Sequence, residues 1–291
     1  MKKNWLSSKY LVMFFVITLA WTWVCGFIPV LLGFTGTGAG MFVFYFGGGA
    51  PSVVALFLVF LTYPKIKRKD YFRRCFSFRY MGLKWPFITI AVFTLLSVLS
   101  VSIGVGLIGY EIPTMDYINA IAANPLNILL VLLLSLISGP LNEEFGWRGY
   151  ALDRLLIKFG FMKGSLILGF IWAIWHLPWY FTPGQAQYNL LQDSTFHALM
   201  FIPSVMMLSV FVSFIYVKTN RSILAGALVH MFSNLIGSQL LSSYTTEISM
   251  LIRYTNMTFF LGVIIYTTFS QKFMAEAAAV IERIQKQEEE D

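Results

Sequence analysis

The chain has 291 residues, of which 57% are apolar and only 12% are charged, and its formal net charge is +7. Soluble domains typically hold about 45–50% apolar and about 25% charged residues, so this composition excludes an ordinary soluble domain and indicates a polytopic membrane protein. The basic residues lie between long apolar runs, which favours a role in membrane orientation over nucleic-acid binding.

Eight segments are long and apolar enough to be transmembrane helices, which need about 20 mostly apolar residues. They are residues 11–32, 41–61, 87–109, 126–147, 163–179, 199–217, 223–241 and 254–270. The sequence therefore predicts an all-α membrane protein with eight transmembrane helices, forming a single domain over residues 1–291. A glycine run at 47–49 predicts a kink and close helix packing in the second span. The Ala-, Glu- and Lys-rich tail predicts a short cytoplasmic helix over about 271–291.

The distribution of Lys and Arg predicts the orientation of these spans. If the N-terminus is cytoplasmic and eight spans follow, every basic residue except Arg253 falls in a cytoplasmic segment, as the positive-inside rule requires. Both termini are therefore predicted to be cytoplasmic, in an integral, multi-pass membrane protein. The most basic segment, 62–86, could also bind anionic lipid head groups, although orientation alone accounts for its charge.

The segment Asn142–Gly149 holds two carboxylates and a guanidinium at the end of the fourth span. An ionisable group at the centre of a span costs ~2.5–3.5 kcal/mol, so such groups are rare and usually functional. Glu144 and Arg148 are four residues apart on one helix face, which predicts an ion pair. Glu143 lies about 100° around the helix, so Arg148 does not easily neutralise it as well. Glu143, the carboxylate without a partner in this pattern, suits a general base. The alternative interpretation of the segment is a helix end with a surface ion pair at the lipid boundary.

Two of the three histidines, His176 and His230, lie in the fifth and seventh predicted spans. Asn234 follows His230 by four residues and shares its helix face. A lone histidine in an apolar helix is more often a packing residue, but polar groups in a bilayer face the bundle interior. Because three spans carry such groups, we expect them to converge on one polar chamber. His197 falls in a predicted outside loop without this context and is treated as incidental.

These residue types are those of a hydrolase. A carboxylate with an imidazole can deprotonate a water, while a second imidazole and an amide can donate hydrogen bonds to a developing oxyanion. The constellation contains no serine or cysteine nucleophile with a matching base. The same groups could instead bind a divalent metal such as zinc, with Glu143, His176 and His230 as ligands, although the sequence has no H-E-x-x-H motif.

The order of the motifs is Glu-Glu-x-x-x-Arg, then aromatic-x-x-x-His, then His-x-x-x-Asn. This order resembles the CAAX protease and bacteriocin-processing family of intramembrane endopeptidases, also called the abortive-infection family. The motifs cover about 126–241, the expected catalytic core, and the span count extends the resemblance to the whole chain. The resemblance implies that Glu144 and Arg148 support the geometry of the site. Trp172 stands where the family more often has Phe, and we expect this departure to alter the wall of the chamber and not the chemistry.

The resemblance also implies the activity. Glu143 would activate water together with His176, and His230 with Asn234 would form the oxyanion site. The reaction would be hydrolysis of a peptide bond in a membrane-associated or lipidated substrate, as in CAAX prenyl proteolysis or in peptide maturation and self-immunity. The family has been described both as metal-dependent and as metal-free, and Asn234 is a poor metal ligand, which favours no metal. From the residues alone, a non-proteolytic scaffold or regulator and a proton-coupled transporter using Glu143 are the alternatives.

One conflict concerns depth in the membrane. At ~1.5 Å per residue, Glu143 lies near the cytoplasmic edge of its predicted span, whereas His176 lies about 20 Å along its own. The two side chains meet only if the fourth helix continues past Arg148 or the fifth begins higher. We therefore expect an error in these boundaries.

Overall fold

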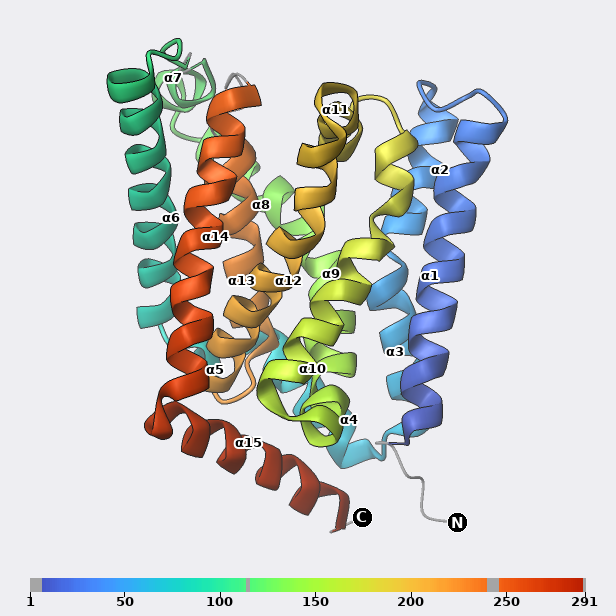
Figure 1. Cartoon of the computed structure of the whole chain (residues 1–291). Coiled ribbons are helices and arrows are strands. Elements are labelled where there is room, and N and C mark those ends of the chain that lie inside the picture. The colour runs from blue at the N-terminus through green and yellow to red at the C-terminus, as the bar shows by residue number, and fades with distance from the viewer. Residues whose placement is uncertain (1–6, 114–115, 240–245, 290–291) are drawn as a thin grey trace.

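The computed structural model describes residues 7–113, 116–239 and 246–289, and every regular element in these ranges is a helix. The helices run side by side in one bundle, and α15 lies across one end of it (Figure 1). The predicted all-α fold is confirmed. The α-helices are α1 (Ser8–Leu31), α2 (Gly38–Gly48), α3 (Ala50–Thr62), α4 (Lys65–Phe76), α5 (Phe78–Met81), α6 (Lys84–Ile103), α7 (Asp116–Ala123), α8 (Asn127–Ile137), α9 (Pro140–Gly146), α10 (Asp153–Trp175), α11 (Ala186–Asp193), α12 (Thr195–Lys218), α13 (Ile223–Asn234), α14 (Thr246–Phe269) and α15 (Gln271–Glu289). The π-helical turns are η1 (Gly104–Ile108), η2 (Trp147–Leu152) and η4 (Leu235–Gln239), and η3 (Leu177–Phe181) is a 3-10 turn.

The outer surface of the bundle carries many large apolar side chains. Leu107 on η1, Leu129 on α8 and Val12 on α1 are 82%, 64% and 59% exposed, which fits contact with lipid rather than with water. Within the described ranges, five helical runs are long and apolar enough to cross a membrane, or up to six if the bent pair α2 and α3 is counted as one span. The protein is an integral membrane protein, while the count of eight spans stays a prediction.

The fourth predicted span is longer than we predicted. α9, η2 and the first part of α10 follow one another without a break, and the chain leaves the helical conformation only at Gly160, where φ is 72°. We ended this span at residue 147 because charged residues follow it. The structure buries the first of them instead, since Arg148 is 0% exposed and ion-paired, so Arg148 does not belong to a cytoplasmic segment. The helix continues past Arg148 and carries Glu143 into the interior, which removes the conflict in depth.

α2 and α3 form a span that is bent by 46°. The hydroxyl of Thr22 on α1 donates a hydrogen bond to the carbonyl of Gly47 at 2.8 Å. A Cβ atom at Gly47 would lie 2.6 Å from the Cβ of Cys25, so only glycine permits this approach. The predicted kink and close packing are both confirmed.

One end of the bundle is formed by α4, α5 and α15, and we call it the basic end (Figure 1). The most basic segment, 62–86, connects the second and third predicted spans and is largely helical here. Its Arg74 is buried and donates hydrogen bonds to Asp70 at 2.9 Å and to the hydroxyl of Tyr216 at 2.8 Å. That hydroxyl in turn donates to Asp153 at 2.8 Å. Part of the basic charge therefore serves a buried polar network, and the predicted C-terminal helix, α15, is present beside it.

Candidate active site

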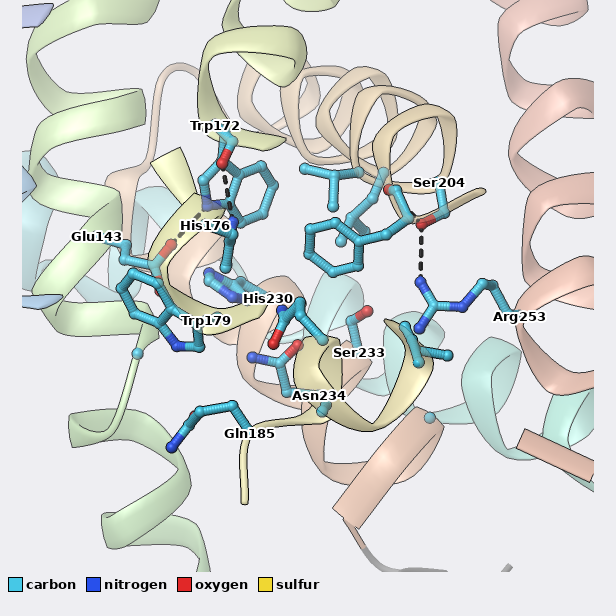
Figure 2. Close-up of a pocket in the computed structure, with 18 of the residues that line it drawn as sticks. Glu143, Trp172, His176, Trp179, Gln185, Ser204, His230, Ser233, Asn234 and Arg253 are labelled. Carbon is cyan, nitrogen blue, oxygen red and sulfur yellow. Dashed lines mark hydrogen bonds between the residues drawn. The ribbon is translucent and has the colours of Figure 1, made fainter. Parts of the chain in front are cut away.

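A cavity of about 630 Å³ lies inside the bundle, and polar residues of α9, α10, α13 and α14 line it (Figure 2). It brings together the four residues that we expected to act on the substrate, which are Glu143, His176, His230 and Asn234. The side chains of the other two predicted site residues, Glu144 and Arg148, lie outside this lining and are completely buried. The three polar helix faces therefore do converge on one chamber.

The cavity opens at the end of the bundle opposite the basic end. Its lining includes Ala186 and Asn189 of α11 and Thr246 at the start of α14, and all three residues are exposed. α11 lies at one end of the bundle, whereas α4 and α15 lie at the other (Figure 1). Water and substrate therefore have access to the cavity from the α11 side.

Glu143 lies in the first turn of α9, directly after the break between α8 and α9. Pro140 occupies an initial position of α9, where its missing N–H leaves no hydrogen bond unmade. The carboxylate is only 6% exposed, and its Oε2 accepts a hydrogen bond from the indole Nε1 of Trp172 at 2.6 Å. A Cβ atom at Gly139 would lie 3.2 Å from Oε1, so the missing side chain leaves space beside this oxygen. Glu143 thus has one oxygen held by the protein and one beside the open cavity.

Glu144 links a buried guanidinium and a buried imidazole. Its Oε1 accepts from the Nη1 of Arg148 at 2.8 Å and lies 2.9 Å from the Nδ1 of His230. The ion pair between Glu144 and Arg148 that we predicted is confirmed, while the contact with His230 was not foreseen. Arg148 is fixed further by Ser209, whose hydroxyl lies 3.4 Å from Nη2, and by the ring of Trp172, 4.6 Å from Cζ. Glu144 and Arg148 lie outside the cavity lining, and Glu144 fixes the position of the His230 ring.

His176 ends α10, and its ring is oriented by the backbone of the same helix. Its Nδ1 lies 2.8 Å from the carbonyl oxygen of Trp172. A carbonyl oxygen only accepts, so Nδ1 carries the proton and Nε2 of the neutral ring keeps its lone pair. The rings of Trp175 and Phe201 pack edge-on at centroid distances of 4.7 and 5.1 Å. The imidazole is thereby held with an unprotonated nitrogen available to a water.

His230 and Asn234 stand one turn apart on α13. The ring of His230 is nearly perpendicular to that of Trp172, at a centroid distance of 5.0 Å, and its Nδ1 is committed to Glu144. A Cβ atom at Gly139 would lie 4.0 Å from the amide nitrogen of Asn234. The space beside Gly139 is therefore shared by an oxygen of Glu143 and the amide of Asn234, which is the arrangement that a water and a carbonyl oxygen need.

Two features of the site were missed from the sequence. We expected Trp172 to alter the wall of the chamber and did not foresee that its indole donates a hydrogen bond to Glu143 and that its ring covers Arg148. We also left α14 out of the site, although Ser249, Arg253 and Asn256 line the cavity. Their spacing of four and three residues within an apolar helix places them on one face, and this signal was available in the sequence.

The residues suggested as metal ligands do not form a metal site in this arrangement. Among the described residues, no group of three or more His, Cys, Asp or Glu side chains could hold a metal ion. The Nδ1 of His230 is turned to Glu144, and an oxygen of Glu143 is turned to Trp172. We therefore derive no step of the reaction through a metal.

Comparisons with known proteins point to one family. Residues 125–236 match a family described as type II CAAX prenyl endopeptidase Rce1-like. Over 238 residues, the chain is 25% identical to a protein named CAAX prenyl protease 2 from Methanococcus maripaludis, a match that covers 81% of this chain and 87% of that protein. The segment that matches the family contains all six residues that we predicted for the site.

Proposed function

We propose that this chain, which belongs to the CAAX protease and bacteriocin-processing family of intramembrane endopeptidases, hydrolyses a peptide bond of a membrane-associated substrate within its cavity. The observation that carries the proposal is the convergence of Glu143, His176, His230 and Asn234 on a single water-accessible cavity. The substrate would be a peptide held at the bilayer by a lipid group or by its own apolar residues. The name of the relative from Methanococcus maripaludis supports a prenylated peptide as one such substrate.

In the proposed mechanism, Glu143 and His176 act on the same water. The oxygen of Glu143 beside Gly139 takes a proton from the water, and the lone pair of His176 Nε2 orients it. The water oxygen then bonds to the carbonyl carbon, and the electron pair of the C=O bond moves onto its oxygen. When the C–N bond breaks, Glu143 returns its proton to the leaving amine. One water is consumed, and a carboxylic acid and an amine are formed.

The oxyanion would be stabilised by Asn234 and His230. The amide nitrogen of Asn234 has hydrogens to donate, whereas His230 donates through Nε2 only when both ring nitrogens are protonated, because Nδ1 already faces Glu144.

The reaction requires no metal in this proposal. The donor geometry described above and the poor ligand character of Asn234 support it. A strong chelator should then leave peptide cleavage unchanged in purified protein. Stoichiometric zinc that is lost together with activity on dialysis against chelator, and restores activity when added back, would contradict the metal-free mechanism.

We also propose that both termini face the cytoplasm. The basic end carries α4 and α15, the start of α1 lies at the same end of the bundle (Figure 1), and a basic end favours the cytoplasmic side. The orientation is independent of the chemistry, and accessibility labelling tests it separately.

The decisive experiment is cleavage of a panel of lipidated and unlipidated peptides by purified protein in liposomes, beside the Glu143→Gln variant. We expect the wild-type protein to cut at least one lipidated peptide. Loss of the base should lower kcat by roughly 10²–10⁴, with the protein still folded. Equal cleavage by both proteins would exclude Glu143 as the base, and no cleavage of any peptide by the wild type would contradict the proposed activity on these substrates.

A further inference from the structure

The segment with α4 and α5 at the basic end concentrates positive charge far from the cavity. Residues 62–86 hold eight Lys and Arg and one carboxylate, that of Asp70, which gives the segment a charge of +7. The formal net charge of the whole chain has the same value. Orientation in the membrane requires only that such charge lies in the cytoplasm, and it does not require the charge to be arranged on one surface.

One face of α4 is anchored in the bundle. The hydroxyl of Tyr71 donates a hydrogen bond to the backbone carbonyl of Phe145 on α9 at 2.8 Å. The guanidinium of Arg74 lies 3.8 Å from a carboxylate oxygen of Asp153 on α10. Tyr71 and Arg74 are both buried. Because these contacts fix the rotation of α4 about its axis, the opposite face of the helix is held outward.

That outward face mixes cations with large apolar side chains. Lys65, Lys69 and Phe76 follow one another at spacings of four and seven residues, which places them on one stripe of the helix. Ile66 and Arg73, also seven residues apart, lie beside this stripe. All five are exposed, and the exposed fractions of Ile66 and Phe76 are 68% and 59%. α5 and the turn into α6 continue the surface with exposed Phe78, Arg79, Leu83 and Lys84. We call these exposed residues of α4, α5 and the turn the basic apolar face.

The chain does little to neutralise the basic apolar face. Arg73 is paired with Asp70 at 3.2 Å. Within the described ranges, no carboxylate pairs with the other four cations of the face. α15 lies at the same end of the bundle (Figure 1), but its exposed charges include an internal pair, between Glu282 and Lys286 at 2.6 Å. Unpaired cations beside exposed apolar side chains are therefore a feature of α4 and α5.

We propose that the basic apolar face binds the head groups of anionic phospholipids. A lipid phosphate complements the cations in charge, and the exposed Ile66, Phe76 and Phe78 suit the boundary between head groups and acyl chains. α4 has only 12 residues, six of them basic, so it lies at the membrane surface and does not span the bilayer. A free anion or a nucleic acid would use the cations but leave the apolar side chains in water. The inference does not depend on the proposed protease function.

The test is thermal unfolding of the purified protein in a neutral detergent, titrated with phosphatidylglycerol or with phosphatidylcholine. A lipid that binds the folded state raises the melting temperature, and the titration gives an apparent Kd. We expect this rise with phosphatidylglycerol and not with phosphatidylcholine, whose head group has no net charge. Lys65→Gln/Lys69→Gln should weaken the apparent Kd for phosphatidylglycerol by roughly 10- to 30-fold, since each basic residue near an anionic surface contributes about fivefold.

The matched control removes the same charge from α10 at the same end of the bundle. Lys158 and Lys163 are exposed and flank Phe161, whose ring packs against that of Phe273 on α15 at a centroid distance of 4.8 Å. Lys158→Gln/Lys163→Gln should leave the apparent Kd for phosphatidylglycerol within about twofold of the wild type, because these lysines lie outside the basic apolar face.

Three results would overturn the assignment. Equal stabilisation of the wild type by both lipids would show that the charge of the head group is not recognised. Equal weakening in the two double variants would show that only the total charge matters. Stabilisation by glycerol phosphate as large as that by phosphatidylglycerol would show a site for a free anion.

Melting in detergent alone shows whether each variant is folded. If Lys65→Gln/Lys69→Gln melts below the wild type there, the salt dependence of the wild type decides instead. The effect of phosphatidylglycerol should then fall steeply between about 0.1 and about 1 M salt, as the Debye length shrinks from about 10 to about 3 Å. An effect that persists at high salt would refute binding through the cations.

Discussion

The two adjacent glutamates give the sharpest test of the site, because the same substitution at each should have opposite consequences. Glu144 holds both Arg148 and His230 through one oxygen, and all three side chains are at most 3% exposed. In Glu144→Gln, the amide oxygen can still accept hydrogen bonds at this place, but the negative charge is lost and Arg148 is left as an uncompensated buried charge. Breaking a buried pair in this way costs about 3–5 kcal/mol.

Glu143 is a matched control one residue away. Its Oε2 accepts a hydrogen bond from the indole of Trp172, and an amide oxygen at the same place can accept it as well. Glu143→Gln should therefore change the free energy of unfolding by less than about 1 kcal/mol, while lowering kcat by roughly 10²–10⁴.

The assay is thermal unfolding in detergent, run beside peptide cleavage on the same preparations. At about 2–4 °C per kcal/mol, Glu144→Gln should melt roughly 6–20 °C below the wild type, and Glu143→Gln should melt close to it. Equal destabilisation by both substitutions would refute the division into a supporting and a reacting carboxylate. So would an intact melting temperature in Glu144→Gln, because the buried ion pair would then contribute no stability.

Three further predictions follow from the site and the orientation. Trp172→Phe removes the indole donor to Glu143 and should lower kcat/KM by roughly 10-fold, with a ring still present in the wall; unchanged kinetics would show that the hydrogen bond is dispensable. Asn234→Ala should lower kcat by ~10²–10³ with little change in KM, as expected for one oxyanion donor, and a change confined to KM would argue for a binding role instead. In intact cells, a cysteine introduced at Tyr188 should react with an impermeant thiol reagent, whereas one at Lys69 should react only after permeabilisation; labelling of Lys69 from outside would reverse the proposed orientation.

The sequence predicted the fold class and the polar residues that meet in the cavity because both depend on strong local signals. Long apolar runs identify membrane helices, and charged or polar groups inside them stand out. It failed where charged side chains are buried and neutralised inside the bundle. Arg148 reads as the end of a span, and only the folded chain shows that the ion pair with Glu144 allows the helix to continue. Arg74 reads as a loop residue for the same reason, although it is buried against Asp153 and Tyr216.

The role of Trp172 was out of reach for a different reason. Whether an indole N–H meets a carboxylate depends on how two helices are rotated against each other, and no spacing along the chain reports that rotation. The polar face of α14 was weaker evidence than the charged motif, because Ser249, Arg253 and Asn256 on one face of a 24-residue helix also suit a helix pair that packs through hydrogen bonds.

The position of the opening has a consequence for the traffic of substrates. If the bundle spans the bilayer, the opening of the cavity at α11 and the basic end face opposite compartments (Figure 1). If the basic end lies in the cytoplasm, a peptide substrate enters the cavity from the non-cytoplasmic side. Secreted or surface-anchored peptides would then reach the protease after translocation, and cytoplasmic lipoproteins would be spared. With the opposite orientation, proteins lipidated in the cytoplasm become accessible and exported ones do not. Determining on which side of the membrane the α11 opening lies would therefore show which class of substrates can reach the cavity, before any single substrate is identified.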